Sequence, residues 1–199
     1  MQESKKLIEI LERHNLNGFE KPGGTDKATW HSYTGVYEHI MTPYKDRDSV
    51  DLLEIGVQLG GSSLLWQEFL GNANLYLVDI ADSRHPSVIE RMNHARSNFY
   101  QIDAYSDSSR NLLLNACPTG FDIIIDDGPH SLESQILCIK NFFSVLKPGG
   151  VMIIEDLQSF DWVYALKQYV PIEYREKIEV FDLRGIKGRH DDIMFVIRK

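Results

Sequence analysis

The sequence alternates between short apolar runs and stretches in which apolar residues recur at helical spacing. The runs are nearly continuous in apolar residues, which is typical of strands that are covered on both faces. Five strands are expected at 50–57, 74–80, 98–103, 121–127 and 151–156. Between them, helices are expected at 62–70, 86–95, 108–116 and 131–146. This strand–helix alternation predicts an α/β protein with a doubly wound parallel sheet.

The C-terminal part follows a different pattern. Residues 161–177 predict a helix that is broken near Pro171. Two further strands, 178–184 and 191–199, are joined by the short polar segment "GIKGRH". They are expected to be antiparallel, because a parallel return needs a crossover of about a dozen residues or more. The segment "KPGG" at 147–150 is expected to end the fourth helix and lead into the fifth strand. Together these patterns predict seven strands, five parallel and two in a terminal hairpin.

Residues 1–45 lie outside the alternation. The first 15 residues predict a short amphipathic helix and do not resemble a signal peptide. With residues 21–40 they are expected to form a helical cover or lid on a core of residues 46–199. A length of 199 residues fits a single domain.

The composition of the chain limits the classes of partner that it is expected to bind. The chain is 43% hydrophobic and 25% charged, as is ordinary for a globular protein. Its formal net charge of −8 argues against a nucleic-acid partner, which would need a basic face. The two cysteines are expected to be free thiols in a reducing compartment. No apolar stretch is long enough for membrane insertion, and we expect a cytoplasmic protein.

The segment "LLEIGVQLGGSSLLW" predicts a strand, a glycine-containing turn and the start of a helix. Gly56 lets the backbone approach a ligand closely, and Ser62 can cap the helix. Asp79 closes the next strand, where a carboxylate can accept hydrogen bonds from both ribose hydroxyls. The loop lacks the G-x-G-x-x-G pattern of a pyrophosphate site, and Glu54 just before it favours a cationic ligand. These residues predict a nucleoside site, with an ordinary turn as the alternative.

Two strands end in paired acids, "FDIIIDDGPH" and "VMIIEDLQ". The carboxyl ends of neighbouring parallel strands meet at one edge of the sheet, so Asp126, Asp127, Glu155 and Asp156 are expected to gather there. Like charges so close must be protonated, paired with a base or neutralised by a cation. No Lys or Arg lies within either motif. Oxygen ligands with one nearby histidine, His130, favour Mg²⁺ over Zn²⁺. The alternative is that the acids end strands and face water.

"LLEIGVQLGG", "LVDI" and the terminal hairpin resemble the class I S-adenosylmethionine methyltransferases. The resemblance implies a Rossmann-like seven-stranded sheet, with Asp79 on the ribose and the glycine loop beside the methionine part. It also implies that Asp103 and Ala104 lie near the adenine, while Asp126 faces the cofactor. The cofactor-binding residues expected in total are Glu54, Gly56, Ser62, Ser63, Asp79, Ile80, Asp103, Ala104 and Asp126.

A narrower resemblance rests on "GTDKATWHSYTGVYE", "IDDGPH" and "IEDLQ". Together they resemble the metal-dependent macrolide and deoxysugar (rhamnosyl-type) O-methyltransferases. The resemblance implies a metal, Mg²⁺ or Mn²⁺, on Asp127, Glu155 and Asp156, and His130 as the general base. It implies a sugar hydroxyl as acceptor, for example on rhamnose, which is free, activated or part of a glycan.

Some questions stay open at the level of the sequence. The side chains of Lys27, His31, Tyr33 and Tyr37 either line the acceptor pocket or pack on the core. One alternative is a metal-dependent catechol-type O-methyltransferase, which would use the same kind of metal site to methylate an aromatic diol. A non-catalytic S-adenosylmethionine-binding partner of a glycosyltransferase would lack the metal ligands, which are present here. A nicotinamide-dependent dehydrogenase is disfavoured by the glycine loop. Homo-oligomers and fusion or association with glycosyltransferase domains are compatible with the sequence.

Overall fold

The computed structural model describes residues 6–199. The strands are β1 Val50–Ile55, β2 Ala73–Asp79, β3 Ser97–Gln101, β4 Phe121–Asp126, β5 Leu146–Ile154, β6 Ile178–Asp182 and β7 Ile193–Arg198. The α-helices are α1 Lys6–Arg13, α2 Thr34–Met41, α3 Gly61–Phe69, α4 Pro86–Ile89, α5 Ser109–Ala116, α6 Leu132–Phe142, α7 Trp162–Lys167 and α8 Arg184–Lys187. Short 3₁₀ helices span Thr42–Tyr44, Phe143–Val145 and Ile172–Lys177.

The seven strands form one mixed sheet in the order β3-β2-β1-β4-β5-β7-β6. Neighbours from β3 to β5 are parallel, and β7 pairs antiparallel with both β5 and β6. This confirms the predicted Rossmann-like sheet of five parallel strands and a terminal hairpin. The strand order reverses between β1 and β4, and open α/β sheets bind ligands above such a reversal.

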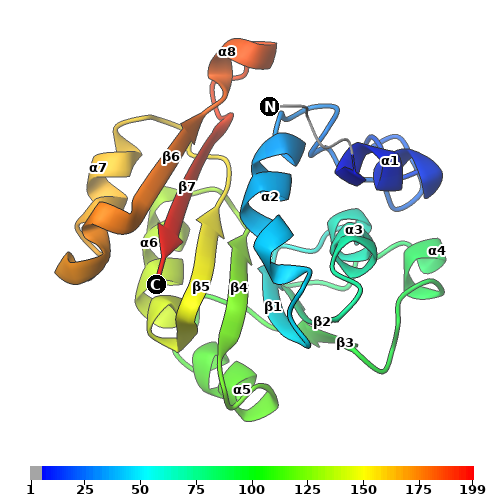
Figure 1. The fold of residues 1–199 in the computed structure, drawn as a ribbon, viewed down its shortest axis with the longest axis horizontal. Coiled ribbons are helices and arrows are strands. Elements are labelled where there is room, and N and C mark those ends of the chain that lie inside the picture. The colour runs from blue at the N-terminus through cyan, green and yellow to red at the C-terminus, as the bar shows by residue number, and fades with distance from the viewer. Residues whose placement is uncertain (1–5) are drawn as a thin grey trace.

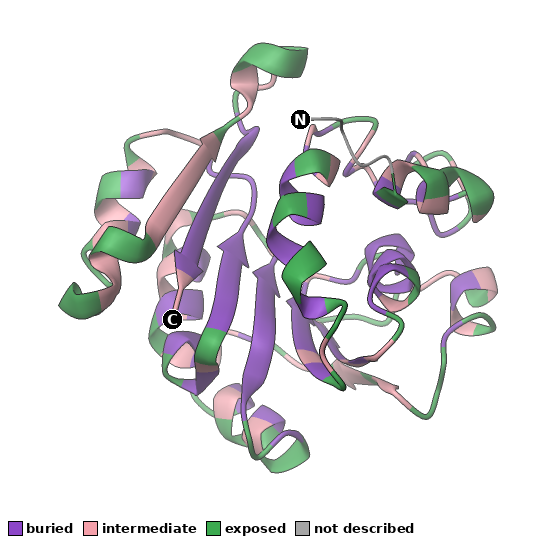
Figure 2. Ribbon diagram, in the orientation of Figure 1, coloured by how far each residue is buried: buried purple, intermediate pink, exposed green. Residues whose placement is uncertain are grey.

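Helices cover both faces of the sheet (Figure 1). Apolar side chains of α1, α2 and α3 pack on one face, and those of α5, α6 and α7 pack on the other. The central strands are therefore buried along most of their length, as Figure 2 shows. Continuous burial is why these strands are apolar at nearly every position instead of at alternate ones.

The structure corrects several element boundaries, and the expected strand at 178–184 ends at Asp182 because Arg184–Lys187 form α8. The helix expected at 86–95 is the short α4, Pro86–Ile89, because this segment buries only Val88 and Met92 and so lacks an apolar face long enough to hold more turns. The helix expected to reach 146 ends at Phe142 and continues as a 3₁₀ turn. The segment 147–150 lies inside β5 instead of before it, because Leu146 already pairs with Phe121. The extra residues form a bulge at Gly149, whose φ is 75°.

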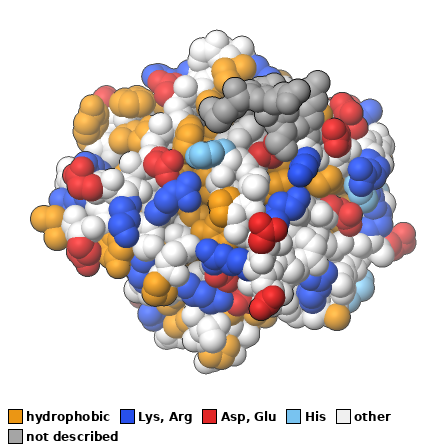
Figure 3. Space-filling view, viewed as in Figure 1, with side chains coloured by type: hydrophobic (Ala, Val, Ile, Leu, Met, Phe, Trp, Pro, Cys, Tyr) orange, Lys and Arg blue, Asp and Glu red, His pale blue; other side chains and the backbone are white. Residues whose placement is uncertain are grey.

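The surface agrees with the composition. Acidic and basic side chains are interspersed on the face seen in Figure 3. No helix within residues 6–199 is long and apolar enough to cross a membrane.

Candidate active site

A cavity of about 390 Å³ opens where the strand order reverses. Its lining comes from the loops that follow the five parallel strands, and from the cover loop, which we define as residues 14–33 between α1 and α2. Because the strands are ordered β3-β2-β1-β4-β5, the lining runs in one direction across the sheet. It passes Asp103 after β3, Asp79 at the end of β2, Gly56 after β1, Asp127 after β4 and Asp156 after β5.

The glycine loop after β1 lies directly against the loop after β4. Gly56 has a φ of 87°, and a Cβ atom there would lie 1.9 Å from the backbone oxygen of Asp127. Any side chain at this position would therefore push the two loops apart. Asp79 steadies the same loop, because its Oδ2 accepts hydrogen bonds from the backbone N–H groups of Val57 at 2.8 Å and Gln58 at 2.9 Å.

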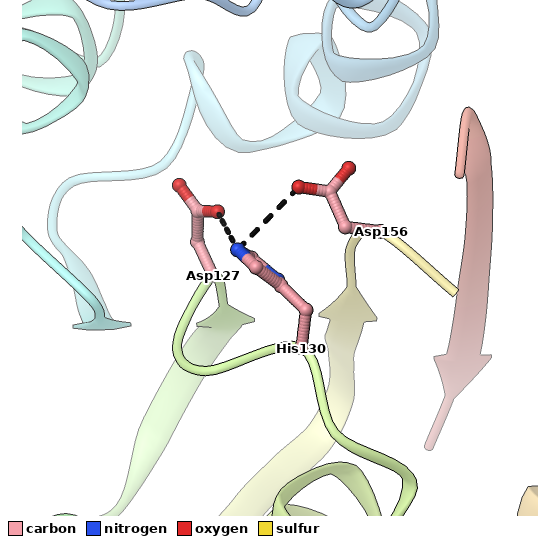
Figure 4. A group of neighbouring side chains, drawn as sticks. All are labelled: Asp127, His130 and Asp156. Carbon is pink, nitrogen blue, oxygen red and sulfur yellow. Dashed lines mark ion pairs between the residues drawn. The ribbon is translucent and has the colours of Figure 1, made fainter. Parts of the chain in front are cut away.

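Three of the predicted site residues converge at the end of the cavity formed by the loops after β4 and β5. Asp127, His130 and Asp156 each place a ligand atom within 4.8 Å of the others (Figure 4). His130 Nε2 lies 3.8 Å from Asp127 Oδ1 and 3.5 Å from Asp156 Oδ2. His130 and Asp156 both have positive φ angles, 54° and 55°. Such backbone conformations are costly for residues other than glycine and are common at functional sites.

Lys27 of the cover loop contacts Asp127 and the neighbouring Glu155. Its Nζ donates hydrogen bonds to Asp127 Oδ2 at 2.8 Å and to Glu155 Oε1 and Oε2 at 2.9 and 2.7 Å. Tyr37 also donates to Glu155. Lys27 is only 1% exposed. Burial by itself would lower the pKa of Lys27, but Asp127 and Glu155 raise it well above the usual value. The lysine is therefore charged and neutralises one carboxylate.

Asp156 has partners from the cover loop as well. Tyr33 donates a hydrogen bond to Asp156 Oδ1, and His31 Nδ1 lies 3.4 Å from the same oxygen. His31 Nδ1 is also 2.6 Å from Asp192 Oδ1, which fixes the ring. Burial, together with the charge of Asp127, raises the pKa of Asp156, and it raises that of Glu155 in the same way despite Lys27. Burial is the largest cause of both raised pKa values, and the charge of Asp127 adds to it.

The donor atoms at this end fit a hard divalent cation. Asp127 and Asp156 supply carboxylate oxygens beside one imidazole, the set that favours Mg²⁺ or Mn²⁺ over a thiolate-binding metal. Both oxygens of Glu155 are already bound by Lys27. A metal in contact with Glu155 would therefore share these oxygens with Lys27 and Tyr37.

A family model described as a methyltransferase domain matches residues 53–157. That stretch contains the glycine loop, Asp79, the Asp127 motif and the Glu155 motif.

The chain belongs to this methyltransferase family.

Curated relatives of the methyltransferase domain share its sequence over part of their length. A rhamnosyl tetracenomycin-C 2'-O-methyltransferase of Streptomyces olivaceus is 35% identical over 155 residues, which are 74% of this chain and 39% of that protein. Demethylmacrocin O-methyltransferase of Streptomyces fradiae is 30% identical over 66% of this chain and 33% of its own length. The matched region thus covers less than half the length of each of these two relatives.

A solved structure has the same fold. The MycE methyltransferase, in complex with Mg, SAH (S-adenosylhomocysteine) and mycinamycin VI, superposes with a TM-score of 0.68 at 23% identity. The superposition covers 97% of this chain and 53% of the MycE chain. At this identity the likeness establishes the fold of the methyltransferase domain and no more.

Most of the predicted site residues surround the cavity. Those in its lining are Gly56, Ser62, Asp79, Ile80, Asp103, Ala104, Asp127, His130 and Asp156. The remaining four, Glu54, Ser63, Asp126 and Glu155, are buried behind the lining. Ser63 donates a hydrogen bond to Glu54, and Tyr105 donates one to Asp126 at 2.5 Å. The roles of all thirteen residues stay predictions.

Several lining residues were not predicted from the sequence. The cover loop contributes Phe19, Gly24, Thr25 and Asp26, and the loop after β3 contributes Tyr105. The pair of glycines in "KPGGTDK" was the available signal, because paired glycines outside a regular element mark a close backbone approach. Lys27, His31, Tyr33 and Tyr37, which the sequence left open, are all buried and contact acids of the site.

Proposed function

We propose that this chain is an S-adenosylmethionine- and divalent-metal-dependent O-methyltransferase that acts on a sugar hydroxyl. The observation that carries the proposal is the convergence of Asp127, His130 and Asp156 at one end of a cavity whose other end holds Asp79 and Asp103. A methyl donor and a metal-bound acceptor would meet between these ends. Membership of the methyltransferase family supports the methyl transfer.

The cavity fits the methyl donor. Its volume of about 390 Å³ lies in the range of small-molecule sites. At the end formed by the loops after β2 and β3, Asp79 can accept hydrogen bonds from a ribose, and Ile80, Ala104 and Tyr105 offer apolar surface to a flat base. Gly56 approaches the loop after β4 closely, so a donor bound over Gly56 would have its centre near Asp127.

In the proposed reaction, the methyl group moves from the sulfonium of S-adenosylmethionine to the acceptor oxygen. The hydroxyl proton passes to His130 Nε2, and the products are a methyl ether and S-adenosylhomocysteine. Imidazole suits this role because it exchanges protons near neutral pH. Asp127 and Asp156, 3.8 and 3.5 Å from Nε2, stabilise the imidazolium that forms.

The metal would be held by Asp127 and Asp156, with Glu155 as the third ligand that the family resemblance implies. When bound, a divalent cation polarises the acceptor hydroxyl and fixes its angle of approach. Tyr33 and His31 orient Asp156, and Lys27 orients Asp127, so the carboxylates are in place before a cation arrives.

The sugar acceptor is proposed from the curated relatives. Several of these relatives are named for the methylation of sugar-bearing compounds, including a rhamnosyl tetracenomycin.

The test is a methyl-transfer assay with S-adenosylmethionine, Mg²⁺ and either a rhamnoside or a catechol. The proposal expects a methylated rhamnoside and S-adenosylhomocysteine, with the activity lost in EDTA and restored by excess Mg²⁺. Transfer to catechol alone would reject the sugar acceptor while keeping the metal chemistry. Transfer that is insensitive to EDTA would reject the metal.

A further inference from the structure

The cavity needs an anionic group for the cationic end of its proposed ligand. The sequence suggested Glu54 for this purpose, but Glu54 is 0% exposed and lies outside the lining. Trp66 Nε1 donates to it at 2.8 Å, and Ser63 donates as well. Burial raises the pKa of Glu54. The carboxylate is therefore occupied with holding α3 against β1, and another acid must face the ligand.

Asp26 of the cover loop is that acid by position. Two residues before it, Gly24 packs against the start of α3, where a Cβ on Gly61 would lie 2.6 Å from the Gly24 carbonyl carbon. One residue after it, Lys27 is bound to Asp127 and Glu155. The segment between these two anchors crosses the cavity, and Asp26 belongs to its lining.

The Asp26 carboxylate is charged and accessible from the cavity. Its side chain keeps 18% of its exposure, and Oδ2 lies 3.4 Å from His31 Nε2. Burial raises the pKa of Asp26, but the hydrogen bond to His31 and the charge of Lys27 outweigh it, so the pKa is lowered. His31 is shared with Asp156 and Asp192. Asp26 is thus not neutralised by a dedicated base.

The order of the strands sets the direction of the ligand. The nucleoside end lies above β3 and β2, and the site of methyl transfer lies above β4 and β5. The amino-acid part of S-adenosylmethionine is attached to the same sulfur as the transferred methyl group. The space between these two ends, above β1, is available to it, and there the cover loop lines the cavity.

We propose that Asp26 binds the α-ammonium group of the methionyl part of S-adenosylmethionine. This inference rests on the proposed function, because it assumes that this cofactor occupies the cavity. It makes the cover loop a wall of the cofactor site in addition to a support for the carboxylates.

The experiment is calorimetric titration, without metal, of wild type and Asp26→Asn with two ligands. S-adenosylhomocysteine carries the amino-acid part, and 5'-methylthioadenosine lacks it. The proposal expects Asp26→Asn to weaken S-adenosylhomocysteine binding about 10- to 100-fold, the value of one charge-assisted hydrogen bond. Binding of 5'-methylthioadenosine is expected to stay within about threefold.

Controls separate the possible failures. Asp107→Asn removes an exposed charge outside the lining and is expected to leave both affinities unchanged. Equal loss for both ligands in Asp26→Asn, or no loss for either, overturns the role of Asp26. If wild type binds neither ligand, the proposed function fails instead.

A third ligand, S-adenosylhomocysteine with hydrogen in place of its α-amino group, completes the cycle. It is expected to bind wild type about 10- to 100-fold more weakly than S-adenosylhomocysteine, and to bind Asp26→Asn as that variant binds the parent compound. If Asp26→Asn does not fold, Asp26→Glu takes its place in the titrations. This variant is expected to lose affinity for S-adenosylhomocysteine selectively. Equal affinity of wild type for the amino and desamino compounds overturns the proposal without any variant.

Discussion

Two clusters of acids and bases lie at opposite ends of the central strands. The amino-end cluster consists of Arg47, Asp51, Asp122 and Lys147. Lys147 Nζ lies 2.6 Å from Asp51 Oδ2 and 2.8 Å from Asp122 Oδ2, and Arg47 Nη1 is 2.8 Å from Asp122 Oδ1. Two acids face two bases, so the charges of this cluster are balanced.

The carboxyl-end cluster consists of Lys27, Asp127, Glu155 and Asp156. Three acids face one lysine, and the histidines His31 and His130 are its other basic neighbours. Lys27 is 1% exposed, whereas Lys147 in the amino-end cluster is 23% exposed. The surplus of negative charge is thus concentrated where water screens it least.

The difference separates a structural cluster from a functional one. A balanced, partly exposed cluster ties strand ends together and asks for no further partner. An unbalanced, buried cluster stores repulsion that a cation can relieve, and such sites are where functional groups concentrate. His130 and Asp156, two of the four non-glycine residues with positive φ among residues 6–199, also lie at the carboxyl end. Four predictions test whether this contrast between the two clusters holds.

The largest expected effect is on catalysis at the carboxyl end. His130→Ala should lower turnover by about 10²- to 10⁴-fold, because the acceptor proton loses its base. S-adenosylhomocysteine affinity should be unchanged, which calorimetry can verify. A loss of less than a few-fold would remove His130 from the role of general base.

The next effect is on stability. Lys27→Met should lower the free energy of unfolding by about 3–5 kcal/mol, because it leaves Glu155 buried without a counter-charge. Lys147→Met should cost about 1 kcal/mol, since its acids stay closer to water. Urea unfolding measures both. The double change Lys27→Met with Glu155→Gln should recover most of the loss, and equal costs for Lys27→Met and Lys147→Met would refute the contrast.

Metal binding should distinguish the clusters directly. Asp127→Asn should weaken Mg²⁺ binding by about 100-fold or more in protein saturated with S-adenosylhomocysteine, since loss of even an outer-sphere partner costs roughly 10- to 100-fold. The matched control Asp122→Asn should leave Mg²⁺ affinity unchanged. Isothermal titration measures both. An unchanged Mg²⁺ affinity in Asp127→Asn would place the metal elsewhere.

The smallest effect concerns pH at the amino end. Burial would lower the pKa of Lys147, but hydrogen bonds to Asp122 and Asp51 raise it above 10.5. A folded pKa above the unfolded one gives stability that is complete below about pH 10.5 and is lost as the pH rises through the folded pKa. The difference in unfolding free energy between wild type and Lys147→Met should therefore be constant from pH 7 to 9 and shrink above about pH 10.5. If the difference persists above about pH 10.5, the contribution of Lys147 to stability comes from its aliphatic chain and not from its charge.

Much of this architecture is readable in the sequence because the relevant signals are local. Continuous apolar runs identify the strands, and alternation with helices fixes their parallel direction. Once the strands are parallel, acids at their ends must meet at one edge. That is why Asp127 and Asp156 were predicted as neighbours of His130, and the structure brings them together.

Side-chain direction and distant partners were decided only by the tertiary structure. Glu54 turns away from the cavity because Ser63 and Trp66 of α3 offer it hydrogen bonds there. Lys27 reaches the acids from 100 residues away in the chain. A count of bases within the two acidic motifs therefore missed it.

The sequence by itself thus determined the sheet, the cavity's place above the strand reversal and the acids along it. The tertiary structure decided the partner of each acid: Lys27 neutralises Glu155, whereas Asp26 lies in the cavity lining beside His31. The physical reason is that strand formation depends on neighbours a few residues away, whereas the charge balance of a buried site depends on every group that packing brings within a few ångströms.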